Sequence, residues 1–147
     1  MGTKYDEDAA LWAQEQGALL RAGRMSEIDR ENVAEEIEAM GRRERGELHD
    51  RMSALLTCLI KWYFLPGRRC QIWRDEIAVQ RNALPDVLRD SPSLTPVLSD
   101  AQWLGAAWAD AVRTVVVDTG LVEAIFPSRC PWSLENVLAR GYFPEAD

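Results

Sequence analysis

The sequence predicts an all-α protein, a single-domain, irregular antiparallel bundle of about five main helices with a C-terminal arm. Apolar residues recur along most of the chain at alternating spacings of four and three, which places them on one face of a helix. Strand patterns are nearly absent, because the one β-branched run, 114–117, continues a helical pattern. At 147 residues the chain is long enough for one core. We therefore expect one domain over 1–147, with a bundle over 1–120 and an arm over 121–147 packed on it.

The first two helices are expected over about residues 6–21 and from Ser26 or Asp29 onward. Acidic residues favour the first turn, Gly23 is a natural C-cap, and both Ser26 and Asp29 are good N-caps. Whether the second helix ends at Gly41 or runs into the next one stays open. The inward positions of the first helix are Tyr5, Trp12 and Leu19, with Leu20 beside them. The apolar stripe of the second is Val33, Ile37 and Met40.

The central helix covers about residues 42–65 and is the structural spine of the predicted bundle. Pro66 and Gly67 stop it and turn the chain into a helix over about 69–89. Within that helix, Pro85 removes a backbone hydrogen bond and should kink it or split off its last turn. The buried face of the central helix is Leu48, Met52, Leu55, Leu59 and Trp62. The inward positions of the next are Trp73, Ile77, Gln80 or Arg81, Leu84 and Leu88.

The last long helix is expected from Ser93 to about residue 118, with Pro96 in its first turn and Gly120 ending it. Ser133 caps one more short helix in the arm. Apolar residues of the arm should attach it to the bundle, and these are Ile125, Phe126, Trp132 and Phe143.

Composition indicates a soluble cytoplasmic protein. No apolar run approaches the roughly 18 residues that span a bilayer, and the acidic N-terminus does not resemble a secretory signal. The three cysteines have no CxxC spacing and are expected to be reduced thiols. A formal net charge of −7 argues against general nucleic-acid binding. We therefore predict no membrane association.

Charge is unevenly spread along the chain. Residues 41–81 carry nine Lys/Arg against five Asp/Glu, a balance of +4, which leaves −11 for the remainder. Two interpretations stay open: the centre pairs with the chain's own acidic helices, which is favoured, or it binds an anion or partner. Arginine over tryptophan can add cation–π attraction. The candidate surface consists of Lys61, Trp62, Arg68, Arg69, Trp73, Arg74 and Arg81.

No catalytic, metal or cofactor site is predicted. His49 is the single histidine, so a histidine ligand set for zinc is impossible and a Ser-His-Asp set is not readable. Arg43 and His49 have the spacing of helical ribonuclease domains of the HEPN type, but arginine-rich helices produce this pattern freely. The glutamates at 35, 36 and 38 lack the Glu-x-x-His partner of bundle metal sites and are expected to be solvated.

Several segments, spread in order over nearly the whole chain, resemble one bacterial family. They include YDEDAALWAQEQGALLRAGR, ENVAEEIEAMG, LIKWYFLPGRRCQIWRDEIAVQR and FPSRCPWSLENVL. The family is catalogued as a domain of unknown function, number twenty-nine, and is common in cyanobacteria and proteobacteria. The resemblance implies a small all-helical cytosolic protein and no particular activity. Cys58 stands where the family pattern suggests a histidine, which weakens a catalytic interpretation.

The function is therefore not readable from the sequence, but its classes can be ordered. A non-enzymatic interaction protein is favoured, with an unknown protein partner or with itself as a homo-oligomer through an apolar helix face. The alternative is an accessory protein that binds an anion or nucleic acid at the basic corner. A HEPN-like ribonuclease comes third.

Overall fold

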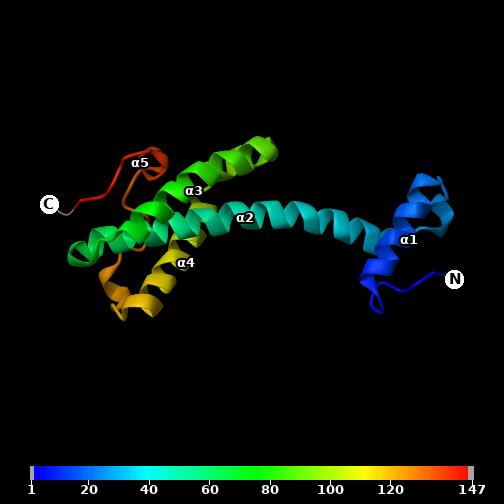
Figure 1. Ribbon diagram of the computed structural model, residues 1–147, viewed down its shortest axis with the longest axis horizontal. Coiled ribbons are helices and arrows are strands. Elements are labelled where there is room, and N and C mark those ends of the chain that lie inside the picture. Colours follow the sequence, from blue (N-terminus) through cyan, green and yellow to red (C-terminus); the bar gives the residue numbers. More distant parts are fainter. Residues whose placement is uncertain (1, 146–147) are drawn as a thin grey trace. The chain divides into compact units, whose positions relative to one another are not determined.

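The computed structural model describes residues 2–145, and over this range the protein is all-α, which confirms the predicted fold class (Figure 1). Short 3₁₀-helices, labelled η, connect the α-helices. In chain order the elements are α1 (Ala9–Arg21), η1 (Met25–Glu27), α2 (Arg30–Phe64), η2 (Pro66–Arg68), α3 (Gln71–Asp90), η3 (Pro92–Ser99), α4 (Ala101–Thr119), η4 (Glu123–Ile125) and α5 (Leu134–Leu138).

The contacts divide the chain into two compact units, one up to Arg43 and one from Glu44 onward. Helix α2 belongs to both, because it runs without interruption from Arg30 to Phe64. The second and central helices of the sequence are thus one helix, and Gly41 lies in its interior. That the whole chain forms a single domain stays a prediction.

The first unit is organised around Trp12, which is 4% exposed. Its indole Nε1 donates to Asp29 Oδ2 over 3.0 Å, and the Asp29 amide donates to Gln16 Oε1 over 2.8 Å. Helix α1 begins at Ala9 and not near residue 6, because the Asp8 carboxylate is its N-cap. Gln16 takes the buried position next to Trp12. The expected inward set was therefore partly wrong, since Leu19 is half-buried and Leu20 is exposed.

The stripe expected to bury the start of α2 is largely uncovered in the described residues. Ile37 is 68% exposed and Met40 is 63% exposed, while Val33 is half-buried. Of the two suggested N-caps, Asp29 is used, since it accepts from the Asn32 amide.

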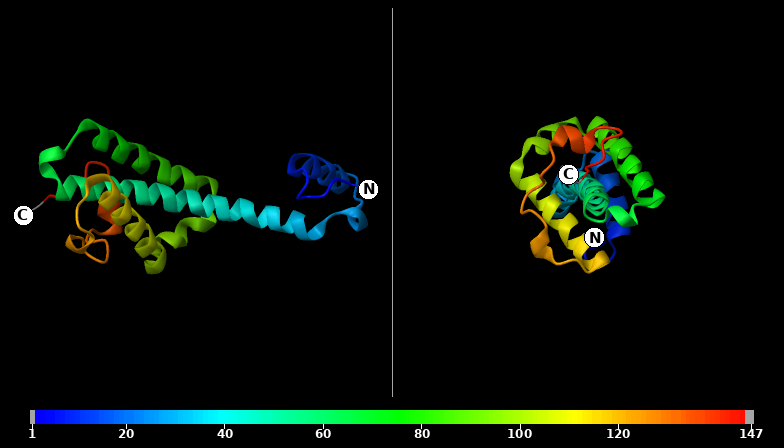
Figure 2. Two further views of the ribbon diagram at one scale, coloured as in Figure 1. Left: turned by 90° about the horizontal axis from the view of Figure 1, so that it is seen from below. Right: turned by 90° about the vertical axis from the view of Figure 1, so that its left-hand side faces the viewer.

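The second unit holds the main core. The predicted face of α2 is buried, with Leu48, Met52, Leu55 and Leu59 fully enclosed. After η2, helix α3 returns antiparallel along α2, and α4 packs against the same part of α2 (Figures 1 and 2). Ile77 and Leu84 of α3 are buried against this core. Helix α3 continues past Pro85 to Asp90, so no final turn is split off there.

The expected start of the last long helix was wrong. Residues 92–99 form the 3₁₀-helix η3, and α4 begins only at Ala101. The Asp100 carboxylate accepts hydrogen bonds from the amides of Gln102 and Trp103, and so caps α4 at that point. Gly120 ends α4 in the left-handed conformation, with φ of 74°.

The segment after Gly120 returns to the core of the second unit. Phe126 and Val137 are buried, and Trp132 and Phe143 pack beside them. Ile125, by contrast, is 50% exposed and does not anchor the segment as expected. The Trp108 indole donates to the Pro127 carbonyl over 2.9 Å, which ties the segment to α4.

Candidate functional site

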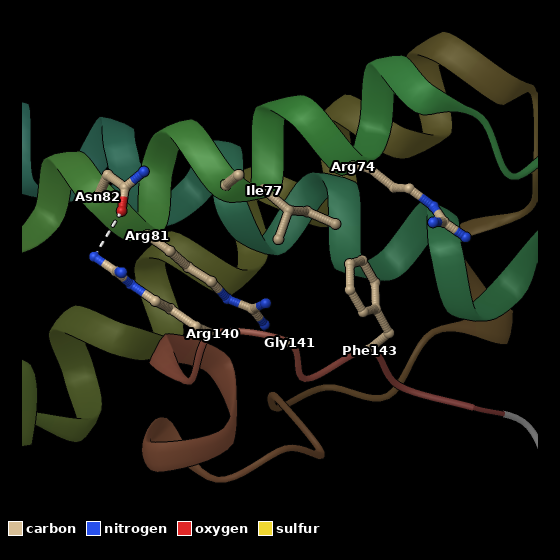
Figure 3. Close-up of a pocket in the computed structure, with 8 residues that line it drawn as sticks. Arg74, Ile77, Arg81, Asn82, Arg140, Gly141 and Phe143 are labelled. Atoms are coloured by element: carbon tan, nitrogen blue, oxygen red, sulfur yellow. Dashed lines mark hydrogen bonds between the residues drawn. The ribbon is translucent and has the colours of Figure 1, made fainter.

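A cavity of about 230 Å³ lies between α3 and the chain that follows α5 (Figure 3). Apolar side chains and guanidinium groups share its wall, and the lining contains no carboxylate. The lining residues are Arg74, Ile77, Ala78, Arg81, Asn82, Arg140, Gly141 and Phe143.

Arg81 is the buried cation of this pocket, with only 5% of its surface exposed. Its Nε donates to the Val137 carbonyl over 2.9 Å and one terminal nitrogen donates to the Asn136 carbonyl over 3.4 Å. No carboxylate of the described residues forms an ion pair with it. Burial lowers the pKa of Arg81, and Tyr142 acts weakly in the opposite direction. The two carbonyls hold the guanidinium in place but do not neutralise its charge.

Arg74 and Arg140 add two exposed guanidinium groups to the same pocket. Arg74 lies over the rings of Trp62 and Phe143, at 5.1 and 5.9 Å from their centroids. Arg140 donates to the Asn82 side-chain oxygen over 3.1 Å. Neither forms an ion pair within the described part of the chain. Their hydrogen-bond donors remain available to an anion.

Two cations of the predicted basic corner, Arg69 and Arg74, lie over the Trp62 ring. Arg69 stacks on this indole at 4.8 Å and donates from Nε to the Trp62 carbonyl over 2.9 Å. Arg68 is exposed on η2, and Trp73 is half-buried. Lys61 does not contribute a free charge to this group, because its Nζ forms an ion pair with Asp118 over 2.8 Å. Of the seven predicted residues, Arg74 and Arg81 line the pocket itself.

Sequence reasoning missed the residues that complete the pocket from the C-terminal side. Arg140, Gly141 and Phe143 reach α3 from about 60 residues away in the chain. Phe143 was expected only to attach the arm, and its ring indeed packs at 4.7 Å from that of Trp62. The one local signal was Arg140 followed by Gly141, whose φ of 80° permits the turn after α5.

A second cleft, of about 370 Å³, contains His49, Cys58, Glu76 and Asp110. His49 Nε2 lies 2.7 Å from Asp110 Oδ2, so the single histidine is held by a carboxylate. Cys58 lies nine residues further along the same helix, which separates the two by roughly 13 Å of axial rise. Burial, helped by Glu76, raises the pKa of Cys58 to about 11, which keeps the thiol protonated. This cleft therefore lacks an activated cysteine nucleophile.

The part of the chain described here contains no cluster of side chains suited to bind a metal ion. Within residues 2–145, no three His, Cys, Asp or Glu side chains are grouped to hold an ion. None of the described helices combines the length and apolar character needed to cross a membrane.

The fold and the pocket together define a small all-α protein with a positively charged, partly apolar cavity. A comparison with known protein families identifies the family of this chain. The chain belongs to the family described as domain of unknown function DUF29, whose profile matches residues 4–143. The resemblance read from the sequence segments is thereby confirmed. Neither a curated protein nor a solved structure matches the chain.

Proposed function

We propose that this protein is a non-enzymatic binding protein that captures an anionic ligand in the pocket of Arg74, Arg81 and Arg140. One observation carries this proposal: three guanidinium groups line one cavity, and no carboxylate lines it. Other arginines of the described residues do pair with carboxylates, as Arg51 does with Glu47. What distinguishes the pocket arginines is that three of them share one cavity and that one of them, Arg81, is buried.

Arg81 is the pocket residue whose charge is most expensive to bury, since it is 5% exposed. Moving a charged group out of water costs several kcal/mol unless a counter-charge or complete hydrogen bonding offsets the loss. The carbonyls of Val137 and Asn136 offset part of it, but they carry no net charge. An anion in the cavity would supply the missing counter-charge, and Arg74 and Arg140, which line the same cavity, would add two further positive charges. Arginine suits this role because its planar fork matches carboxylate and phosphate oxygens.

Calorimetric titration with inorganic phosphate and phenyl phosphate tests the proposal. The double variant Arg74→Gln, Arg140→Gln removes two charges from exposed positions and should spare the fold. We expect it to weaken binding by at least about tenfold, since charge-assisted hydrogen bonds contribute about 1.5–3 kcal/mol each. Arg89→Gln is the matched control, because Arg89 is exposed on the same helix and pairs with Asp86. The proposal fails if neither probe binds at millimolar concentration, or if the control loses as much affinity as the double variant.

A second candidate function, self-association, is favoured by the exposed stripe of Ile37 and Met40. These residues lie three apart and so share one face of α2. The charged residues Glu35, Glu38 and Arg42 lie on the opposite face of α2, where Arg42 pairs with both glutamates. The apolar stripe is therefore free to meet the same stripe of a second copy, as in an isologous dimer.

Light scattering over a range of protein concentrations tests this second candidate. The wild type should become dimeric as concentration rises, and the variant Ile37→Glu, Met40→Glu should stay monomeric. Ile72→Glu provides the control, because Ile72 is 77% exposed but lies on α3. A wild type that remains monomeric at the highest concentration, or a control that abolishes the dimer equally, removes the candidate.

A further inference from the structure

We infer that the ligand of the arginine pocket is a small molecule with one flat apolar ring and one anionic head, either phosphate or carboxylate. This inference rests on the proposed function and names its ligand class. It excludes bare inorganic anions as the preferred ligands, and it excludes nucleic-acid backbones. Three features of the pocket carry it, namely its size, its apolar wall and the placement of its charges.

The size of the cavity selects small ligands. Drug-sized molecules occupy pockets of roughly 300–1,000 Å³, whereas an apolar cavity of about 150 Å³ already binds benzene. At about 230 Å³ the cavity lies between these limits. It therefore has room for one six-membered ring with a charged substituent, and it is too large to be filled by phosphate alone.

The wall of the cavity fits a ring. Ile77 is 1% exposed, and Phe143 lies opposite it in the pocket (Figure 3). Ala78, one position further along α3, also lines the cavity. Figure 3 shows the Phe143 ring beneath α3, on the side of the pocket where Arg74 descends. A site for a bare anion would gain nothing from such apolar surfaces, which water solvates poorly. A flat ring gains both burial and an aromatic neighbour.

The three guanidinium groups are spread along the pocket, with that of Arg81 between the other two (Figure 3). Arg81 extends from α3 toward Gly141, and its guanidinium lies 5.8 Å from the centroid of Phe143 (Figure 3). Arg140 runs past Arg81 toward Asn82, which accepts a hydrogen bond from its guanidinium, and the Arg74 guanidinium lies at the other end, beyond the Phe143 ring (Figure 3). A ring placed on Phe143 would thus carry its anionic head within reach of the buried Arg81. Such a mixture of apolar wall and few polar groups is typical of small-molecule sites.

Titration of four probes tests the ligand class: phenyl phosphate, benzoate, inorganic phosphate and a single-stranded RNA oligonucleotide. We expect phenyl phosphate to bind at least about tenfold more tightly than inorganic phosphate, because burial of one ring gains that factor or more. Benzoate compared with phenyl phosphate decides between the two head groups, and binding of either one in preference to inorganic phosphate supports the inference.

Two variants test the contribution of the apolar wall to affinity separately from that of the arginines. Phe143→Ala should reduce the affinity for phenyl phosphate to about that for inorganic phosphate, while leaving the latter within about twofold. Ala78→Trp, at an exposed position of α3, should fill the cavity and have the same selective effect without removing an anchor of the C-terminal segment.

Equal affinities for phenyl phosphate and inorganic phosphate, both lost in Arg74→Gln, would overturn the ligand class but leave the proposed function standing. Salt-sensitive RNA binding that depends on Arg74, without binding of phenyl phosphate, would also overturn it. Absence of binding by all four probes would instead refute the proposed function itself.

Discussion

Replacement of Gly41 and Gly46 by alanine is expected to stabilise the middle of α2. Both glycines lie inside this helix, and a Cβ added at either position meets no other atom within 4 Å. Glycine costs roughly 0.5–1 kcal/mol relative to alanine in a helix interior, because its backbone loses more freedom on folding. The double variant should therefore raise the local free energy of opening by about 1–2 kcal/mol.

Amide hydrogen exchange followed by mass spectrometry measures this effect directly. A change of 1–2 kcal/mol corresponds to a factor of about 5–30 in an opening equilibrium. Exchange of the amides over residues 40–47 should slow by that factor, while buried amides near Leu55 should change little. Gly120→Ala is the opposite control, because Gly120 has φ of 74° and alanine there is strained.

Three outcomes of the exchange experiment would contradict this expectation. If residues 40–47 of the wild type exchange at the rate of an unfolded peptide, α2 is not continuous across Gly41. If the double variant exchanges no more slowly than the wild type, glycine is not what limits the helix there. If Gly120→Ala proves stabilising, the conformational argument itself is wrong.

Three further predictions concern single side chains. Trp108→Phe should lower the free energy of unfolding by about 1–3 kcal/mol in urea titrations, because the Pro127 carbonyl loses its indole donor; an unchanged midpoint would contradict this. Asp100→Ala should cost about 0.5–2 kcal/mol in the same assay through loss of the α4 cap, whereas Asp100→Asn should cost much less. Burial raises the pKa of Cys58 from 9.0 to about 11, so the folded state binds the thiol proton more tightly. The protonated thiol therefore contributes about 3 kcal/mol to stability below pH 9, and this contribution is lost as pH rises through 11. Between pH 9 and pH 11 the wild type should thus lose about 3 kcal/mol of unfolding free energy relative to Cys58→Val.

The candidate site was predictable only on the side that belongs to α3. Arg74 and Arg81 stood out because they lie in a basic, aromatic stretch, and helical spacing placed Arg81 near the inward face. Arg140 and Phe143 could not be assigned to the same site, since nothing local to them specifies which helix they meet. Their position depends on how the last residues pack against α3 and Trp62.

The sequence by itself determined the helical class, the corner at Pro66 and the buried face of α2. These features rest on interactions within one or two turns of helix: apolar spacing, caps and the missing amide of proline. It also misplaced the start of α4, because Ser93 and Asp100 both have the chemistry of an N-cap and only packing selects between them.

Tertiary structure alone decided the pairings between residues distant in the chain. Arg81 meets the Val137 carbonyl across 56 positions, Arg140 meets Asn82 across 58, and His49 meets Asp110 across 61. Each of these contacts requires the core to bring two helices or a helix and a loop together first. Local periodicity carries no information on that step, because closure of a long chain segment is favourable only when many side chains pack at once. The pocket is therefore a property of the packed fold, although two of its three arginines could be read from the sequence.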